Sequence, residues 1–251
     1  MNDNCDEIYI GAYWRDHALS AREYIQVSYK FISELEKLSP IFGERCVVIG
    51  DQTVATAVPS DYAAFERLVS QMINDPDYLY DNPNPAQKTF TLDSRISKGF
   101  RVSFSDGHAG AKRETAISVS VKAGAYGSRR SAPNVVLIEL PLNAIDPLDR
   151  KLFLRKLFLL TIDSWKPAFA VLSSRELRDL LDPTNRYSFT VGALTYFKDE
   201  RVGDTCSDLA SAERLDAGGV LINIEYDEPW AKSEEKYRPC FDSLAKAGFL
   251  A

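Results

Sequence analysis

Three consecutive strand-like segments near the middle of the chain constrain its fold more than any other feature. They are GFRVSFSDG from Gly99, ETAISVSVKAG from Glu114 and NVVLIELP from Asn134. Runs rich in β-branched residues favour strands, and the turns between these runs are rich in Gly and Ser. The sequence therefore predicts an antiparallel meander.

The segments before the meander predict both strands and helices. Ser20 and Glu23 stand at the spacing of a capping box, and an apolar stripe follows them until Pro40 ends the helix. The elements expected in this part are a strand over 7–14, helices over 20–40 and 61–73, and a short buried strand over 46–50.

The segments after the meander continue this irregular mixture. They are a helix opened by Asp146 and Pro147 and stopped at Lys166 and Pro167, the strand AFAVLSS, the short helix RELRDLL, a strand TVGALTYF from Thr190, a short helix around Leu209, the strand GGVLINIEY and a last helix ending at Gly248. Strands and helices in irregular order predict an α+β fold with one large mixed, mainly antiparallel sheet flanked by helices. The helix between the third meander strand and AFAVLSS could form a crossover unit.

The size and composition of the chain predict a single domain over 1–251. Its 251 residues can bury a sizeable core, and 45% hydrophobic with 26% charged residues is typical of a globular protein. The segment 75–85 contains three prolines, so it is expected to be a loop, with a possible boundary near 75–88. The longest apolar stretch, 152–162, is far shorter than the roughly 20 residues that span a bilayer.

The termini and the cysteines indicate a cytoplasmic protein. The N-terminus MNDNCDEIYIG is acidic where a secretory signal would be basic. The widely spaced cysteines form no C-x-x-C pair, so they are interpreted as reduced packing residues: Cys5, Cys46, Cys206 and Cys240.

Acidic residues are concentrated near the C-terminal end. The formal net charge of the chain is −6, which disfavours nucleic acid as a direct ligand. From Lys198 onwards there are 12 Asp and Glu against 7 Lys and Arg, a balance of −5. This part is the predicted binding face for a basic partner, unless it is merely a solvated surface that keeps the protein soluble. The candidate contacts are Asp199, Glu200, Asp204 and Asp208 in one loop, and Asp227, Glu228 and Trp230 in another.

The sequence offers few groups for catalysis, and we predict no catalytic residue, no cofactor and no metal site. The two histidines, His17 and His108, are interpreted as turn residues, and no zinc, Walker or nucleophile-elbow motif occurs. The glycine-rich segment 124–130 could cradle an anion but also fits a hairpin turn. Glu234, Glu235 and Lys236 match the end of a nuclease-type metal site, with Asp227 upstream, although such a tripeptide is frequent by chance.

The tryptophans favour burial with one exception. Trp165 closes an apolar helix and is expected to be buried, as is Trp14 at the end of a strand. Trp230 follows YDEP and is equally compatible with burial and with an interface.

Taken in order, these segments resemble the immunity protein 52 family of bacterial polymorphic toxin systems. The matching segments are YIGAYW at 9–14, SARE from Ser20, GFRVSFSDG from Gly99, SVSVKAGAY from Ser118, NVVLIELP from Asn134, WKPAFAVLSS from Trp165, VGALTYF from Val191, GGVLI from Gly218 and the final AGFL. Ala193 stands where the family is expected to have an aromatic residue, and Arg15 follows Trp14 where it often has Gly.

The resemblance implies an immunity protein that inhibits a cognate secreted toxin by direct stoichiometric binding and has no catalytic residues. The implied partner is a nuclease effector with a restriction-endonuclease-like domain, delivered by a type VI secretion system. Because a nuclease carries basic surface, an acidic inhibitor would be steered towards it. The alternatives are a metal-dependent hydrolase or nuclease that uses Asp and Glu, and a non-catalytic ligand-binding scaffold.

Overall fold

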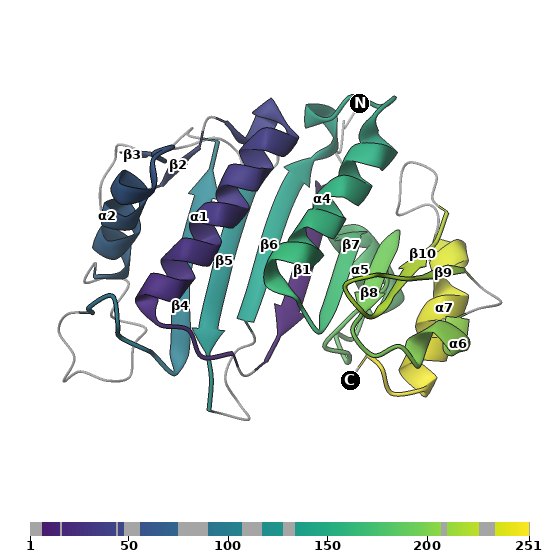
Figure 1. Cartoon of the computed structure of the whole chain (residues 1–251). Helices are drawn as coiled ribbons and strands as arrows, with labels where there is room; N and C mark the ends of the chain where they lie inside the picture. Colours follow the sequence, from purple (N-terminus) through teal and green to yellow (C-terminus); the bar gives the residue numbers. More distant parts are fainter. Residues whose placement is uncertain are drawn as a thin grey trace. The chain divides into compact units, whose positions relative to one another are not determined.

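A computed structural model describes residues 7–15, 17–43, 45–47, 56–74, 90–106, 117–127, 134–206, 210–225 and 234–250. One sheet contains ten strands in the order β3-β2-β4-β5-β6-β1-β7-β8-β10-β9, and helices accompany it (Figure 1). This is the predicted α+β fold, and the pairs β2–β3, β2–β4, β4–β5, β7–β8, β8–β10 and β9–β10 are antiparallel, as expected.

The chain divides into two compact units, one of Met1–Ala12 with Glu139–Ala251 and the other of Tyr13–Ile138. The strands are β1 Glu7–Trp14, β2 Cys46–Val47, β3 Thr56–Ala57, β4 Lys98–Ser105, β5 Ser118–Ala125, β6 Asn134–Pro141, β7 Phe169–Ser174, β8 Leu194–Phe197, β9 Ser211–Arg214 and β10 Val220–Asn223. The helices are α1 Ala21–Leu38, α2 Tyr62–Ile73, α4 Arg150–Trp165, α5 Arg175–Leu181, α6 Val202–Cys206 and α7 Glu234–Lys246, with 3-10 turns at Pro40–Phe42 and Leu142–Ala144. None of these described helices is long and apolar enough to cross a membrane.

In the unit Tyr13–Ile138, α1 and α2 pack on one face of β4 and β5. The predicted capping box is present, since the Ser20 side chain accepts from the backbone N–H of Glu23 and the Glu23 carboxylate accepts from that of Ser20. The apolar stripe of α1 brings Tyr24 onto the sheet, where its ring lies 5.4 Å from Phe100 and its hydroxyl donates to the carbonyl of Val121 at 2.9 Å. The helix is therefore anchored by both packing and a buried hydrogen bond.

In the second unit, α4 lies over the sheet beside β7 (Figure 1), and it borders a pocket together with Leu172 of β7 and Leu194 of β8. Alternate residues of these strands point to opposite faces. Phe169 and Phe197 therefore face away from α4, with ring centroids 5.0 Å apart, and pack with Phe189 and Phe249. Trp165 at the end of α4 is buried, as predicted, and Lys166 ends that helix in a left-handed conformation at φ 46°.

Several predicted element boundaries require correction. The helix expected to open at Asp146 begins at Arg150, because the Asp146 carboxylate accepts the N–H of Leu148 and forms a turn. The strand expected from Thr190 begins at Leu194, because the N–H of Gly192 is bonded to the Thr195 hydroxyl.

Two further differences concern the short elements. The short helix lies at Val202–Cys206, whereas Leu209 is outside the described residues. The polar strand β9 was not predicted at all. The proposed boundary near 75–88 also lies outside the described residues, and the single domain over 1–251 stays a prediction.

Candidate functional site

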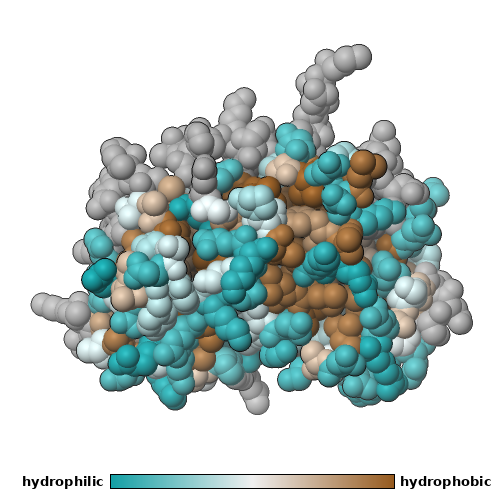
Figure 2. Space-filling view, turned by 45° about the horizontal axis from the view of Figure 1, so that its top comes forward, coloured by the Kyte–Doolittle hydropathy of each residue, from teal (hydrophilic) through white to brown (hydrophobic). Residues whose placement is uncertain are grey.

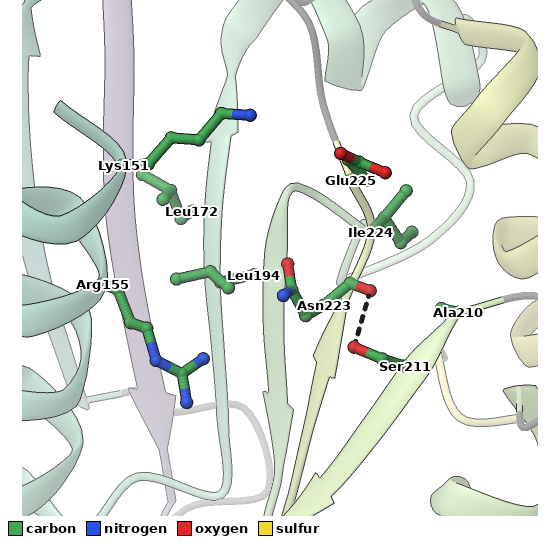
Figure 3. Close-up of a pocket in the computed structure, with 9 residues that line it drawn as sticks. All are labelled: Lys151, Arg155, Leu172, Leu194, Ala210, Ser211, Asn223, Ile224 and Glu225. Atoms are coloured by element: carbon green, nitrogen blue, oxygen red, sulfur yellow. Dashed lines mark hydrogen bonds between the residues drawn. The ribbon is translucent and has the colours of Figure 1, made fainter. Parts of the chain in front are cut away.

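A pocket of about 550 Å³ opens between α4 and the strands β9 and β10, and we refer to it as the α4 pocket. Helix α4, the strands β7, β8 and β10 and the start of β9 position its walls (Figure 3). The residues that line it are Lys151, Arg155, Leu172, Leu194, Ala210, Ser211, Asn223, Ile224 and Glu225.

The α4 pocket has an apolar floor. The side chains of Leu172, Leu194 and Ile224 are buried, although each borders the cavity. Because they come from β7, β8 and the end of β10, the sheet itself forms the bottom of the pocket. Such a floor favours apolar groups of a ligand or a partner.

The rim of the α4 pocket is charged and polar. Lys151 and Arg155 project from α4, while Ser211, Asn223 and Glu225 lie across from them (Figure 3). The Ser211 hydroxyl donates to the Asn223 carbonyl at 3.4 Å. A partner that enters the pocket therefore meets cations on one side and oxygen acceptors on the other.

An ion pair joins the rim to the end of the sheet. The Arg155 guanidinium donates to the carboxylate of Glu213 in β9 at 2.6 Å. Both groups are partly exposed, so the pair adds little to stability. It nevertheless connects α4 to β9, the terminal strand of the sheet, and holds the Arg155 side chain at the rim of the pocket.

The approach to the α4 pocket carries exposed leucines. Leu148, in the turn before α4, is 94% exposed, and Leu152, in the first turn of the helix, is 56% exposed. Figure 2 shows hydrophobic side chains gathered over the face that carries α4, with hydrophilic side chains around them. Exposed apolar patches bordered by polar groups mark binding surfaces.

The structure places three of the predicted acidic contacts around α6, and two of them are paired with arginines. The Asp199 carboxylate accepts from Nε of Arg201 at 2.9 Å, and this hydrogen bonding lowers the pKa of Asp199 to about 2. The Glu200 carboxylate accepts from Arg214 of β9 at 3.2 Å. Asp204 lies exposed in α6. The pairing weakens the negative field that the sequence predicted here.

The remaining predicted contacts, Asp208, Asp227, Glu228 and Trp230, lie outside the described residues, as do Cys5, His108 and the basic end of the segment 124–130. His17 is described, and it lies exposed in the segment between β1 and α1. The binding face predicted from the two acidic loops therefore stays a prediction.

The nuclease-type tripeptide lies in the first turn of α7. At 100° per residue, Glu234 and Lys236 point about 200° apart around the helix, so they do not converge on one site. The Glu234 carboxylate instead pairs with Arg238, one turn later. Within the described part of the chain, no group of three or more His, Cys, Asp and Glu residues could hold a metal ion.

The sequence contains one signal for the α4 pocket, in the helix that Trp165 closes. The segment RKLFLRKLFLL alternates cations with large apolar residues and has no extended polar face. A helix that does not separate its cations from its apolar residues leaves some apolar side chains at the surface, as it does Leu152. The strand residues of the pocket have no comparable signal, because the fold brings them together from distant positions.

The sequence matches no known family profile and no curated protein. Among solved structures, the chain is similar to the Pseudomonas aeruginosa T6SS protein PA0821, with a TM-score of 0.53 and 12% sequence identity. The similarity covers 95% of this chain and 74% of the other. At this identity the similarity establishes a shared fold.

Proposed function

We propose that this protein is an immunity protein that binds one cognate secreted antibacterial toxin and neutralises it by direct stoichiometric inhibition, without chemistry of its own. The observation that carries the proposal is the surface beside α4, where exposed leucines and cations adjoin an apolar floor. When another protein covers such a surface, apolar area leaves water and the charged rim finds partners. An inhibitor needs such a surface and no reactive group.

The fold and the charge support one class of toxin as the partner. The fold is similar to that of a protein described as a T6SS protein, which supports an effector of a type VI secretion system as the partner. The resemblance of the sequence to the immunity protein 52 family supports a nuclease effector with a restriction-endonuclease-like domain. The balance of −5 from Lys198 onwards suits the basic surface that a nuclease needs for its substrate. The proposed place of action is the cytoplasm, where such a toxin would meet nucleic acid.

The first experiment is co-expression with a candidate secreted toxin, sought among the products of the neighbouring genes. We expect rescue of growth and co-purification of the two chains in a 1:1 complex. Raising the salt concentration to about 0.5 M should slow association, because it shortens the Debye length to a few Å. Absence of both rescue and co-purification would contradict the proposed function.

A matched set of variants tests the α4 surface itself. Leu148→Asp together with Leu152→Asp places charges on the exposed leucines, whereas Leu180→Asp changes a leucine on α5 that is 39% exposed. We expect the α4 variant to lose rescue and binding, and the α5 variant to keep both, while circular dichroism finds both folded. If the folded α4 variant protects cells like the wild type, the toxin binds elsewhere.

A turnover assay separates this proposal from an enzyme. The purified protein alone, with Mg²⁺ or Mn²⁺, should leave DNA and RNA intact. Cleavage that disappears in Glu234→Gln would instead favour the metal-dependent nuclease.

A further inference from the structure

Two cysteines that are distant in sequence meet between α6 and α7. The sulfur atoms of Cys206 and Cys240 lie 2.9 Å apart in a thiol–thiol hydrogen bond, and both side chains are buried. Both thiols are free in the structure. From the sequence, Cys206 and Cys240 are expected to be separate packing residues, and it is the packing of α6 against α7 that brings them together.

The two helices direct these thiols at each other through their buried faces. Val202 and Cys206 are four residues apart and lie on the same side of α6. On α7, Cys240 belongs to the buried stripe that also contains Tyr237 and Leu244. Because both stripes are apolar and packed, the thiols are held in register, which raises their effective concentration for each other.

The hydrogen bond makes the two thiols chemically different. The hydrogen bond between the two sulfurs lowers the pKa of Cys206, while the same bond and burial raise the pKa of Cys240. The thiolate is the nucleophilic form of cysteine. These directions favour Cys206 as the attacking sulfur and Cys240 as the resolving sulfur.

We propose that Cys206 and Cys240 are a redox site that forms a reversible intramolecular disulfide on reaction with a hydroperoxide. The Cys206 thiolate attacks the O–O bond of hydrogen peroxide, giving a sulfenic acid and hydroxide. The Cys240 sulfur then displaces the sulfenic hydroxyl as water, once its proton has been lost. In total, two thiols and one peroxide give one disulfide and two waters, and a dithiol reductant reverses the change.

The disulfide would join α6 covalently to α7. Helix α6 has only five residues, so it can open locally to admit a small oxidant at less cost than global unfolding. The loop with Asp199 and Glu200 leads directly into α6. Oxidation would therefore restrict the motion of α6, and with it the C-terminal end of the loop that carries these two acidic groups. This inference does not depend on the proposed function.

The test treats the folded, fully reduced chain with hydrogen peroxide, then denatures it and labels the remaining thiols with a maleimide. The sequence has four cysteines, so we expect four labels before treatment and two after it, with a peptide map that links Cys206 to Cys240. Cys206→Ser and Cys240→Ser should each prevent the link, whereas the matched control Cys46→Ser should leave it intact. Dithiothreitol should restore every thiol.

Several results would overturn the proposal. One is retention of both thiols at peroxide concentrations that oxidise the partly exposed Cys46. Another is a link that joins Cys46 to either buried cysteine, or a link that forms only in denaturant. A melting temperature that does not rise on oxidation, although the link has formed, would contradict the expected restriction of α6.

Discussion

A buried arginine offers the sharpest test of the physical reasoning. The side chain of Arg45 is only 1% exposed, and its guanidinium pairs with Glu36 at the end of α1. One of its nitrogens also lies 3.4 Å from the carbonyl of Ile32, whereas Nε has no hydrogen-bond partner. Burial lowers the pKa of Arg45, and the Glu36 carboxylate opposes this shift. The cation thus depends on a single carboxylate.

Arg45 is buried and Glu36 is partly exposed, so replacing each of them should lower the free energy of unfolding by a different amount. Glu36→Gln leaves a buried charge without its counter-ion, which typically costs 3–5 kcal/mol; because Glu36 is 31% exposed, we expect about 3 kcal/mol. Arg45→Met removes the buried charge and leaves a carboxylate that water can reach, so we expect a cost of about 1 kcal/mol. The double variant should be more stable than Glu36→Gln alone.

Urea unfolding followed by circular dichroism measures these free energies. Glu34→Gln is the matched control, since Glu34 lies on the same helix in an exposed pair with Lys37 and should change stability by less than about 0.5 kcal/mol. The reasoning would be refuted if Arg45→Met were at least as destabilising as Glu36→Gln.

Three further predictions follow from single contacts. The pKa of the Asp199 carboxyl, measured by NMR, should be about 2 and should move towards 3.8 in Arg201→Ala. Because the pKa is lowered in the folded state, the stabilising effect of this carboxylate is complete above about pH 4 and is lost as the pH falls to 2. An unchanged titration in the variant would exclude the Arg201 hydrogen bond as the cause. Gly192→Ala should lower the free energy of unfolding, measured in urea, by about 2–3 kcal/mol, because a Cβ there would lie 2.0 Å from the backbone oxygen of Leu172. An unchanged free energy of unfolding would mean that the backbone of β7 can shift without cost. Tyr24→Phe should cost about 1 kcal/mol by losing one buried hydrogen bond to β5, and a stability equal to that of the wild type would show that this bond contributes nothing.

The sequence predicted the fold well where local signals agree with the tertiary structure. The capping box at Ser20 and the alternation of the meander strands specify α1, β4 and β5 without reference to distant residues. Strand β9 has the opposite character, since SAER is exposed at every position and its pairing with β10 comes from backbone hydrogen bonds. Periodicity cannot reveal such a strand.

The candidate site was less predictable than the fold. Charge counting pointed to the acidic segments after Lys198, but it could not foresee that Asp199 and Glu200 would pair with arginines. The floor of the α4 pocket combines Leu172 of β7, Leu194 of β8 and Ile224 just after β10, and β10 pairs with β8 while β9, which precedes it in the sequence, lies outside it. The pocket depends on that topology, so a linear pattern does not contain it.

The two strands at the ends of the sheet have a consequence for solution behaviour. β3 consists of two residues, which is too short to template a long incoming strand. At the other end, Glu213 and Arg214 of β9 place a charge on each face of the terminal strand. Any chain that added itself there would have to bring matching charges in register. Both edge strands of the described sheet are therefore poor templates for the addition of a further strand.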